Sequence, residues 1–431
     1  MRGVRFCAVL LMLLGNGCQK SPPADDSSKQ GADAPRTPSN SVDQTQDEPD
    51  AKFEFVRPRL SREEIEAGWI SLFDGKTLFG WQPDKAGADW EVVDGAIRSQ
   101  SQQPGLLLTP FRMSDFELRC EFRLEAGGNS GLFLRTVAQP SDPTVDCYEL
   151  NICDTHETFP TGSLVGREKP AMTVASEGDW HSYHVRLEGN RIQVQFDDQM
   201  ILDVDEPAGQ VCESGLLGLQ ANGGQVEFRQ IYLRPLNTQP LMNGKDLAGW
   251  SVVPGASGTF ELDSGEIHAA GGPAYLQSDR EFANFILQFD VRVEGDGLNS
   301  GVFFRAEPGT ADAPANGYEL QICNQFADGD RSRPNEYGTG FGTGAIFRRQ
   351  KARWIVSDDR KWMSLALVAD GPRFMTWVDG YPVTVWSDDR KPNRNPRRGL
   401  RLQPGRLSLQ GHDPTTNIRF RNFRIQELPN E

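Results

Sequence analysis

Two carboxylates, an arginine and a histidine lie within one short stretch of this chain and could carry acid–base chemistry. They are Arg135, Glu149, Asp154 and His156. A carboxylate can remove a proton, and a cationic group can stabilise the negative charge that then develops. We therefore expect Glu149 or Asp154 to act as a base and Arg135 to stabilise an oxyanion. A divalent ion held by Glu149, Asp154 and His156 is a further hypothesis.

The same stretch occurs twice in the chain. Arg135 and Glu149 are 14 residues apart, and so are Arg305 and Glu319. The second copy therefore offers Arg305 and Glu319 as further catalytic candidates. It has Asn324 in the place of Asp154, and an asparagine cannot act as a base. If the aspartate is essential, only the first copy is active; if the glutamate suffices, both copies can work. The repeated sequences are Asn129-Ser-Gly-Leu-Phe-Leu-Arg135 with Asn299-Ser-Gly-Val-Phe-Phe-Arg305, and Tyr148-Glu-Leu-Asn-Ile-Cys-Asp154 with Tyr318-Glu-Leu-Gln-Ile-Cys-Asn324.

Alternation of apolar and polar residues places these side chains on strands. Side chains of a β-strand point alternately to its two faces. In 129–135 we expect Leu132 and Leu134 to face the core and Arg135 to face the opposite side. In 148–154 the same alternation predicts that Glu149 shares its face with Asn151 and Cys153. If the two strands are neighbours, Arg135 and Glu149 can meet on the open face. A purely structural cross-strand ion pair is the alternative interpretation.

Short alternating segments dominate the rest of the chain. Strands are expected around 116–124, 192–196 and 285–289, separated by glycine- and asparagine-rich turns. One short helix is expected at 61–68, with Ser61 as the N-cap residue and Glu64 completing a capping box. Many short strands per repeat predict an all-β protein made of β-sandwiches or jelly rolls.

Further matching segments set the limits of the two copies. Residues 72–81 match 241–250, and residues 215–220 match 405–410. We expect one domain at 53–236 and a second at 237–431. The second copy carries two insertions, at 327–339 and at 388–401, and the latter is rich in basic residues. We interpret this basic loop as a solvated surface, with contact to an acidic glycan as the alternative.

Taken together, these motifs resemble those of the 3-keto-disaccharide hydrolase family. The segments that carry the resemblance are the opening Leu72-Phe-Asp-Gly-Lys-Thr-Leu-Phe-Gly-Trp81, the Asn-Ser-Gly…Arg strand, the Tyr-Glu strand and the closing Leu-Gln…Phe-Arg, in both copies. The resemblance implies a concanavalin A-like jelly roll, which agrees with the strand pattern. It also implies cleavage of glycosides that carry a ketone at C3 of the sugar.

The implied reaction gives each candidate residue a role. A C3 ketone acidifies the proton on C2, so a base can remove it, the group on C1 can leave, and water can then add. Glu149, Asp154, Arg135, Glu319 and Arg305 are the catalytic candidates. The sequence requires no cofactor, and a divalent metal stays a hypothesis. We expect seven polar side chains to contact the sugar: Asn129, Asn151, His156, Gln220, Asn299, Gln321 and Gln410.

Other functions are compatible with the same sequence. The jelly roll also serves as a lectin scaffold, so a non-catalytic carbohydrate-binding lipoprotein is the main alternative. A structural surface protein with a protein partner is a third hypothesis. Trp81, Trp180, Trp250 and Trp362 recur at equivalent places, and we expect them to be core residues and not sugar platforms. The net charge of −15 argues against a nucleic-acid partner.

The amino-terminal segment predicts export. Arg2 and Arg5 precede an apolar stretch at 6–14, as in a signal peptide that ends at residue 18. Cys18 follows small residues and resembles the lipidated cysteine of bacterial lipoproteins. Residues 19–52 are polar and predict a disordered tether with a reach of about 30–35 Å. We therefore expect a cell-envelope protein anchored by lipid, in the outer membrane, or otherwise a periplasmic or secreted one.

Five cysteines remain beyond Cys7 and Cys18, and an odd number leaves at least one thiol unpaired within the chain. Cys153 and Cys323 occupy equivalent places in the two copies, which favours small buried side chains. A disulfide from Cys147 to Cys120 or Cys212 is an open alternative, because spacing does not decide it.

Overall fold

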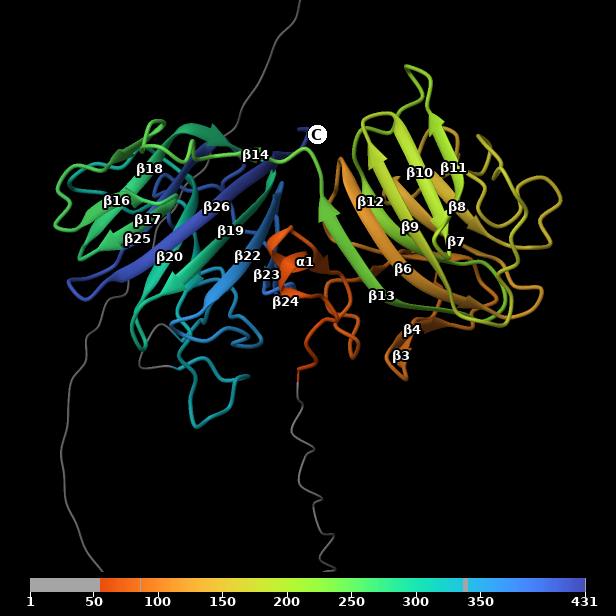
Figure 1. The fold of residues 1–431 in the computed structure, drawn as a ribbon, viewed down its shortest axis with the longest axis horizontal. Coiled ribbons are helices and arrows are strands. Elements are labelled where there is room, and N and C mark those ends of the chain that lie inside the picture. The colour runs from red at the N-terminus through yellow and green to blue at the C-terminus, as the bar shows by residue number, and fades with distance from the viewer. Residues whose placement is uncertain (1–54, 86, 336–339, 431) are drawn as a thin grey trace, which may run out of the picture. The chain divides into compact units, whose positions relative to one another are not determined.

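Two β-sandwiches follow one another along the chain, and each consists of an eight-stranded and a five-stranded sheet (Figure 1). The computed structural model describes residues 55–85, 87–335 and 340–430. The predicted signal peptide, Cys18 and the tether at 19–52 lie outside these residues. None of the helices in the described part of the chain is long and apolar enough to cross a membrane.

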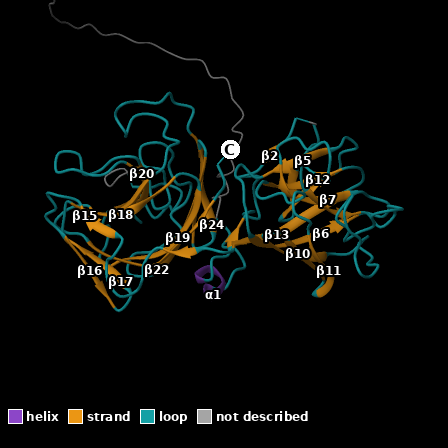
Figure 2. Ribbon diagram, turned by 90° about the horizontal axis from the view of Figure 1, so that it is seen from above, coloured by secondary structure: helices purple, strands orange, loops and turns teal. Residues whose placement is uncertain are grey.

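The only helix among the described residues is α1, and its ends follow from its capping residues (Figure 2). It spans Arg62–Glu66. Ser61 accepts a hydrogen bond from the Glu64 backbone N–H, and the Glu64 side chain accepts one from the Ser61 N–H. This capping box satisfies N–H groups that a helix start leaves unpaired. The predicted short helix with its capping box is confirmed.

The first sandwich takes up the chain from Ile70 to Pro235, and all its strand pairs are antiparallel. The eight-stranded sheet has the order β11 (Gln199–Asp205), β10 (Arg191–Phe196), β9 (His181–Glu188), β6 (Phe116–Leu124), β13 (Val226–Pro235), β4 (Ala96–Ser99) and β3 (Glu91–Val93), with β1 (Ile70–Ser71) also on β13. The five-stranded sheet has the order β2 (Gln82–Pro83), β5 (Gly105–Leu108), β12 (Leu216–Ala221), β7 (Ser130–Thr136) and β8 (Tyr148–Ile152).

The second sandwich repeats this arrangement, and its five-stranded sheet matches that of the first sandwich strand for strand. Its eight-stranded sheet has the order β16 (Thr259–Asp263), β17 (Glu266–Ala270), β26 (Asn417–Glu427), β19 (Phe285–Val293), β22 (Trp362–Asp370), β23 (Arg373–Val378) and β24 (Tyr381–Ser387), with β14 (Gln239–Pro240) on β26. Its five-stranded sheet has the order β15 (Trp250–Val252), β18 (Ala274–Phe282), β25 (Gly405–Gly411), β20 (Ser300–Ala306) and β21 (Tyr318–Ile322).

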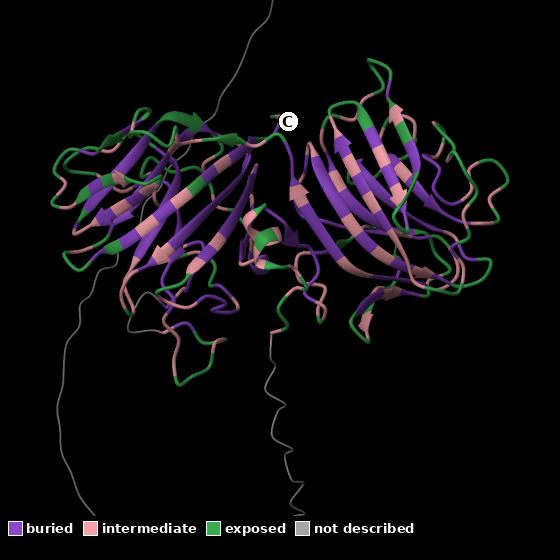
Figure 3. Ribbon diagram, viewed as in Figure 1, coloured by how far each residue is buried: buried purple, intermediate pink, exposed green. Residues whose placement is uncertain are grey.

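The core of each sandwich lies between its two sheets. Burial alternates along β6, where Leu118, Cys120 and Phe122 are buried and the intervening Arg119 and Glu121 are half-buried (Figure 3). This is the pattern of a strand with one face toward the core. On the facing sheet, the predicted inward residues are confirmed in the same core cluster: Leu132, Leu134, Leu150 and Ile152.

Side chains of the second sandwich complete the core of the first. Met375, Val368 and Trp377 belong to the same apolar cluster as the first sandwich's core residues. The Trp377 Nε1–H donates to the Ser71 carbonyl at 2.8 Å. Arg112 forms an ion pair with Asp370, whose side chain is fully buried. The two copies therefore share an apolar and ionic interface within one compact unit.

Two expectations about side chains need correction. Trp81 and Trp250 are buried as expected, but Trp180 and Trp362 are only half-buried. Arg123 and Arg229 lie over the Trp180 ring at 4.9 and 3.8 Å from its centroid, so this ring packs between guanidinium groups on a sheet surface. Trp362 lies beneath two arginines in the same way. Cys120, Cys147 and Cys212 form no disulfide, so neither disulfide considered for Cys147 forms.

Candidate functional site

The outer face of the first five-stranded sheet gathers polar side chains from three neighbouring strands. Glu149 of β8 lies opposite Phe133 of β7, and Gln220 of β12 lies opposite Gly131 of β7. Leu132 and Leu150, the neighbours in sequence, belong to the core. Glu149 and Gln220 therefore face away from the core, as the alternation of side chains predicts.

The Glu149 carboxylate has the surroundings of a general base. Its Oε1 accepts a hydrogen bond of 3.0 Å from the Gln220 Nε2. Burial raises the pKa of Glu149, although the Gln220 hydrogen bond and the charge of His156 act in the opposite direction. A Cβ at Gly131 would lie 3.2 Å from the Gln220 Oε1, so the missing side chain there leaves space for this pair. A half-buried carboxylate of raised pKa that no cationic side chain pairs with can act as a base toward a bound substrate.

His156 lies near enough to Glu149 for its charge to oppose the rise in the pKa of Glu149. Its Nδ1 accepts hydrogen bonds from the Thr158 and Phe159 N–H groups at 3.2 and 2.9 Å. In the neutral ring the proton therefore lies on Nε2. This nitrogen can donate a hydrogen bond to an oxygen atom that gains negative charge.

An apolar surface lies beside the two polar groups. Leu106, Leu108, Phe133 and Cys147 form a separate cluster on this face, with Leu216 packed against it. Pockets that bind organic ligands combine such apolar surface with a few directed polar groups. The outer face of β5, β12, β7 and β8 has both features.

The second sandwich places Glu319 in the same position, with different neighbours. Glu319 lies opposite Phe303, as Glu149 lies opposite Phe133. Its Oε2 accepts a hydrogen bond of 2.9 Å from the Arg397 Nη2. Burial raises the pKa of Glu319, and Arg397 opposes this effect. Glu319 is thus already neutralised by an arginine, which Glu149 is not.

Arg135 does not meet Glu149, and this expectation is wrong. The pairing of β7 with β12 shifts register between Leu216 and Gly218, and Arg135 has a φ of 47°. Such a β-bulge breaks the alternation of side chains. Arg135 is therefore buried, and its guanidinium donates to the carbonyl oxygens of Ser114, Gly189 and Cys212 and to the Asp115 carboxylate at 2.7–2.8 Å.

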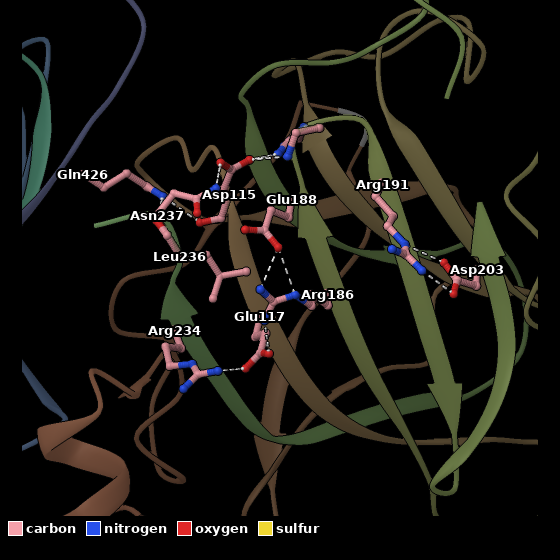
Figure 4. A network of polar contacts seen from close by, with 12 residues as sticks. Asp115, Glu117, Arg186, Glu188, Arg191, Asp203, Arg234, Leu236, Asn237 and Gln426 are labelled. Atoms are coloured by element: carbon pink, nitrogen blue, oxygen red, sulfur yellow. Dashed lines mark hydrogen bonds and ion pairs between the residues drawn. The ribbon is translucent and has the colours of Figure 1, made fainter. Parts of the chain in front are cut away.

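Asp115 connects Arg135 to two further segments of the chain. Asn237 donates to the Asp115 Oδ2 and Gln426 to the Asp115 carbonyl, both at 2.7 Å (Figure 4). Arg135 thus connects chain segments by satisfied hydrogen bonds and has no part in the outer face. Arg305 is the equivalent residue of the second sandwich, with a φ of 47° and donations to Ala283, Gly371, Arg401 and Asn284. Burial lowers the pKa of Arg305 to about 10.

Asp154 is also engaged in structural contacts. Its Oδ1 accepts hydrogen bonds from the hydroxyls of Thr161 and Ser176 at 2.5 and 2.7 Å, and its Oδ2 accepts one from the Ser176 N–H at 2.7 Å. In the second sandwich, Asn324 accepts from Thr343 and Ser357 and donates to Asp359. The aspartate and the asparagine accept equivalent structural hydrogen bonds from a threonine and a serine. The difference between them therefore does not distinguish an active copy.

The hypothetical metal ligands do not assemble. Asp154 is tied to Thr161 and Ser176, and the described residues hold no group of three or more His, Cys, Asp or Glu side chains placed to bind an ion.

The remaining predicted sugar contacts fall into two groups. Asn151 and Gln321 are buried: the Asn151 Nδ2 donates to the Phe159 carbonyl, and the Gln321 Nε2 donates to the Asn299 Oδ1. Asn129 is half-buried at the start of β7, as Asn299 is at the start of β20. Gln220 and Gln410 lie on the outer faces, and the Gln410 Nε2 donates to the Tyr275 hydroxyl at 3.4 Å.

Sequence comparison identifies the family. A sequence profile described as the 3-keto-alpha-glucoside-1,2-lyase-like domain matches residues 68–234 and 237–426. The chain belongs to this family, as two tandem copies. A 3-keto-disaccharide hydrolase of Bacteroides thetaiotaomicron is 35% identical over 77 residues, which are 15% of this chain and 27% of that protein. The alignment therefore spans about a quarter of that relative's length.

Two solved structures are similar to part of this chain. A candidate glycosyl hydrolase of Parabacteroides distasonis is 21% identical, with a TM-score of 0.37, and the match covers 41% of this chain and 98% of that one. The carbohydrate-binding module CBM66 of Bacillus subtilis is 19% identical, with a TM-score of 0.29, and the match covers 36% and 95%.

The two 3-keto-alpha-glucoside-1,2-lyase-like copies of this chain thus share a glutamate and differ around it. Sequence reasoning missed Arg397, Arg348 and Tyr275 as neighbours of the second site. The only signal for Arg397 was the basic insertion at 388–401, and neither spacing nor alternation relates that loop to Glu319. The tertiary fold brings them together.

Proposed function

We propose that the first sandwich cleaves 3-keto-glycosides by elimination and hydration, with Glu149 as the base. The observation that supports this most directly is the Glu149 carboxylate, half-buried on an outer sheet face, raised in pKa and held by Gln220. The family of the chain supports the same reaction class. Arg135 has no role in this mechanism.

The reaction begins with removal of the C2 proton by Glu149. The C2–H electron pair then forms an enolate with the C3 carbonyl, whose oxygen takes the negative charge. The Nε2–H of His156 supplies a donor for that oxygen. The enolate re-forms the ketone as the C1–O bond breaks, and the leaving oxygen takes a proton. Water then adds its oxygen to C1 and a proton to C2, which gives the free 3-keto-sugar.

The proposal is tested with the purified chain and a 3-keto-disaccharide, with and without a chelator to report on a metal requirement. Release of the 3-keto-sugar is measured for the wild type, Glu149→Gln and Glu319→Gln. We expect Glu149→Gln to lose roughly 10²- to 10⁴-fold in rate, the contribution of one positioned base. Glu319→Gln should stay close to the wild type, because Arg397 already pairs with Glu319. Loss of activity in Glu319→Gln alone would assign the reaction to the second sandwich.

Deuterium incorporation separates elimination from direct hydrolysis. Run in D₂O, the proposed reaction places deuterium on C2 of the product, whereas direct hydrolysis keeps the C2 hydrogen. Mass spectrometry of the product, beside a 3-keto-sugar incubated without protein, reads the difference. Product formed without C2 deuterium would contradict the mechanism.

A carbohydrate-binding function is the second candidate, and the second sandwich favours it. Its glutamate is paired with Arg397 and is a poor base for that reason. Binding of the disaccharide by calorimetry, with no release from any linkage tested, would make binding the function of both copies.

A further inference from the structure

A small cavity beside Glu319 is lined by three segments that are far apart in the sequence. It has a volume of about 210 Å³ and lies between residues 317–319, 347–349 and 397–398. The last segment belongs to the basic insertion of the second copy. No motif shared by the two copies accounts for this cavity, and the reaction proposed for Glu149 does not use it.

Four arginines line the cavity, and Glu319 is the only acidic residue among its lining residues. Arg348 and Arg398 are exposed, whereas Arg349 and Arg397 are half-buried. Burial, and then the charges of Arg390 and Arg397, lower the pKa of Arg349. Like charges gathered in one place repel each other, and a bound anion relieves this repulsion. The cluster is notable in a chain with a net charge of −15.

Arg397, which lines the cavity, retains an unused donor. Its Nη2 donates to Glu319, but its Nη1 is buried and has no hydrogen-bond partner among the described residues. A buried donor without a partner costs about 1–3 kcal/mol. An oxygen atom of an anionic ligand would supply the missing acceptor, and guanidinium groups bind carboxylate and sulfate-like oxygens with particular geometric fit.

The sheet face next to the cavity suits the rest of a sugar. The Arg397 guanidinium lies 5.0 Å from the Phe303 ring centroid, and Phe303 belongs to an apolar cluster with Tyr275. On the same sheet, the Ser408 Oγ and the Gln410 Oε1 are buried without hydrogen-bond partners among the described residues. Sugar hydroxyls donate and accept hydrogen bonds, so they could pair with both oxygens.

We propose that the cavity beside Glu319 binds the anionic group of an acidic saccharide, a carboxylate or a sulfate ester. Binding of an anion is supported by the four arginines alone. The saccharide part rests on the function proposed above. In the first sandwich, Gln220 and no arginine among the described residues donates a hydrogen bond to Glu149. The second copy would thus hold a charged carbohydrate while the first copy acts on a glycosidic bond.

Calorimetry with the purified chain tests the proposal with four probes. Trigalacturonate carries carboxylates, a maltotriose sulfate ester carries sulfate, maltotriose is neutral, and inorganic sulfate is the bare anion. We expect the carboxylated or the sulfated saccharide to bind at least about tenfold more tightly than maltotriose, the effect of one charge-assisted hydrogen bond. The two charged probes distinguish the two sources of negative charge.

Variants connect the binding to the cavity. The double change Arg348→Ala and Arg398→Ala removes two exposed charges that line it and should weaken binding of the charged saccharide by about tenfold or more. Arg394→Ala, an exposed arginine of the same insertion that does not line the cavity, is the matched control and should bind as the wild type does. Equal losses in both would mean that only the overall charge of the loop matters.

Three further outcomes overturn the proposal. Maltotriose could bind as tightly as the charged probes, the double variant could bind normally, or inorganic sulfate could bind as tightly as the saccharides, which would mark an adventitious ion only. Glu149→Gln separates this site from the catalytic proposal. It should slow release of the 3-keto-sugar by the roughly 10²- to 10⁴-fold given above and leave binding of the charged saccharide unchanged.

Discussion

Glu149 and Glu319 occupy one position of a repeated fold and differ in the side chains that surround them. Gln220 donates to Glu149, and Arg397 donates to Glu319. A neutral donor brings the Glu149 carboxylate no countercharge, whereas the guanidinium gives Glu319 a positive partner that opposes the effect of burial on its pKa. At the scale of the residue, the chemistry of each copy therefore depends on which side chain reaches its glutamate.

The pH dependence of the reaction should report the pKa of Glu149. A base acts only when it is ionised, so the rate should fall as the pH drops through that pKa. Because burial raises it, the acid limb of kcat/KM should lie above the ordinary value for glutamate. A pH–rate profile for the wild type provides the measurement. An acid limb below the ordinary glutamate range would contradict Glu149 as the base in this environment.

Gln220→Leu should move this acid limb to higher pH. The Gln220 hydrogen bond lowers the pKa of Glu149, so its loss leaves burial less opposed and raises the pKa further. Gln410→Leu, at the corresponding position of the second sandwich, is the matched control and should leave the limb in place. A limb that does not move in Gln220→Leu would mean that another group limits the rate at low pH.

A β-bulge in strand β7 decides where Arg135 points. The register shift opposite Leu216–Gly218 turns Arg135 away from the face that Glu149 occupies. Gly215, just before β12, makes the close approach feasible, because a Cβ there would overlap the backbone carbonyl of Arg135. Gly405 has the same relation to Arg305 in the second sandwich. In both copies, a glycine thus allows the close strand contact at the bulge that contains the buried arginine.

Gly215→Ala should therefore destabilise the first sandwich. The added methyl group would clash with backbone atoms, which cannot move aside as a flexible side chain can, so a cost of about 1–3 kcal/mol or more is expected. Chemical denaturation gives the free energy of unfolding. Ser214→Ala, one residue earlier, should cost well under that. Equal stability of Gly215→Ala and the wild type would show that β7 can relax away from the glycine.

The interface between the two copies depends on a buried ion pair. Arg112 donates through its backbone N–H and its guanidinium to Asp370, whose side chain is fully buried. Burial alone would raise the pKa of Asp370, but the hydrogen bonds and the charge of Arg112 hold it below its usual value. At the scale of the whole molecule, this pair helps to make the two sandwiches one compact unit.

Arg112→Ala should lower the free energy of unfolding by about 1.5–3 kcal/mol, because it removes the guanidinium from the buried Asp370 carboxylate. Arg373, at 3.4 Å, and the backbone N–H of residue 112 stay as partners of Asp370. Arg98→Ala is the matched control, since the Arg98–Glu91 pair lies on the surface and should contribute under about 1 kcal/mol. Both values come from denaturant titration. If the two variants lose equally little, Asp370 must find other partners.

Acid should weaken the same interface. The folded pKa of Asp370 is depressed, so its stabilising effect is complete above the unfolded pKa and is lost as the pH falls through the folded pKa. The wild type should lose stability over that acidic range, and Arg112→Ala should lose less because it lacks the pair. Parallel pH–stability curves for the two proteins would argue against this source of acid sensitivity.

The sequence alone determined the repeat, the all-β class, the α1 capping box and the outward placement of Glu149. These features depend on local alternation and on helix-end chemistry, which a short segment carries by itself. Because the same sequence pattern occurs twice, the strands predicted in the first copy also predict those of the second copy. The family followed from the same repeated motifs.

The hydrogen-bond partners of the arginines depend on the tertiary structure. Alternation predicted that Arg135 shares a face with Phe133, but the bulge that reverses this arises from pairing with β12, some 80 residues further on. The sequence suggested Asp154 as a base, but in the structure its carboxylate accepts hydrogen bonds from Thr161 and Ser176. Arg397 reaches Glu319 across 78 positions of sequence. A side chain's partners depend on long-range pairing, and strand periodicity carries no information about them.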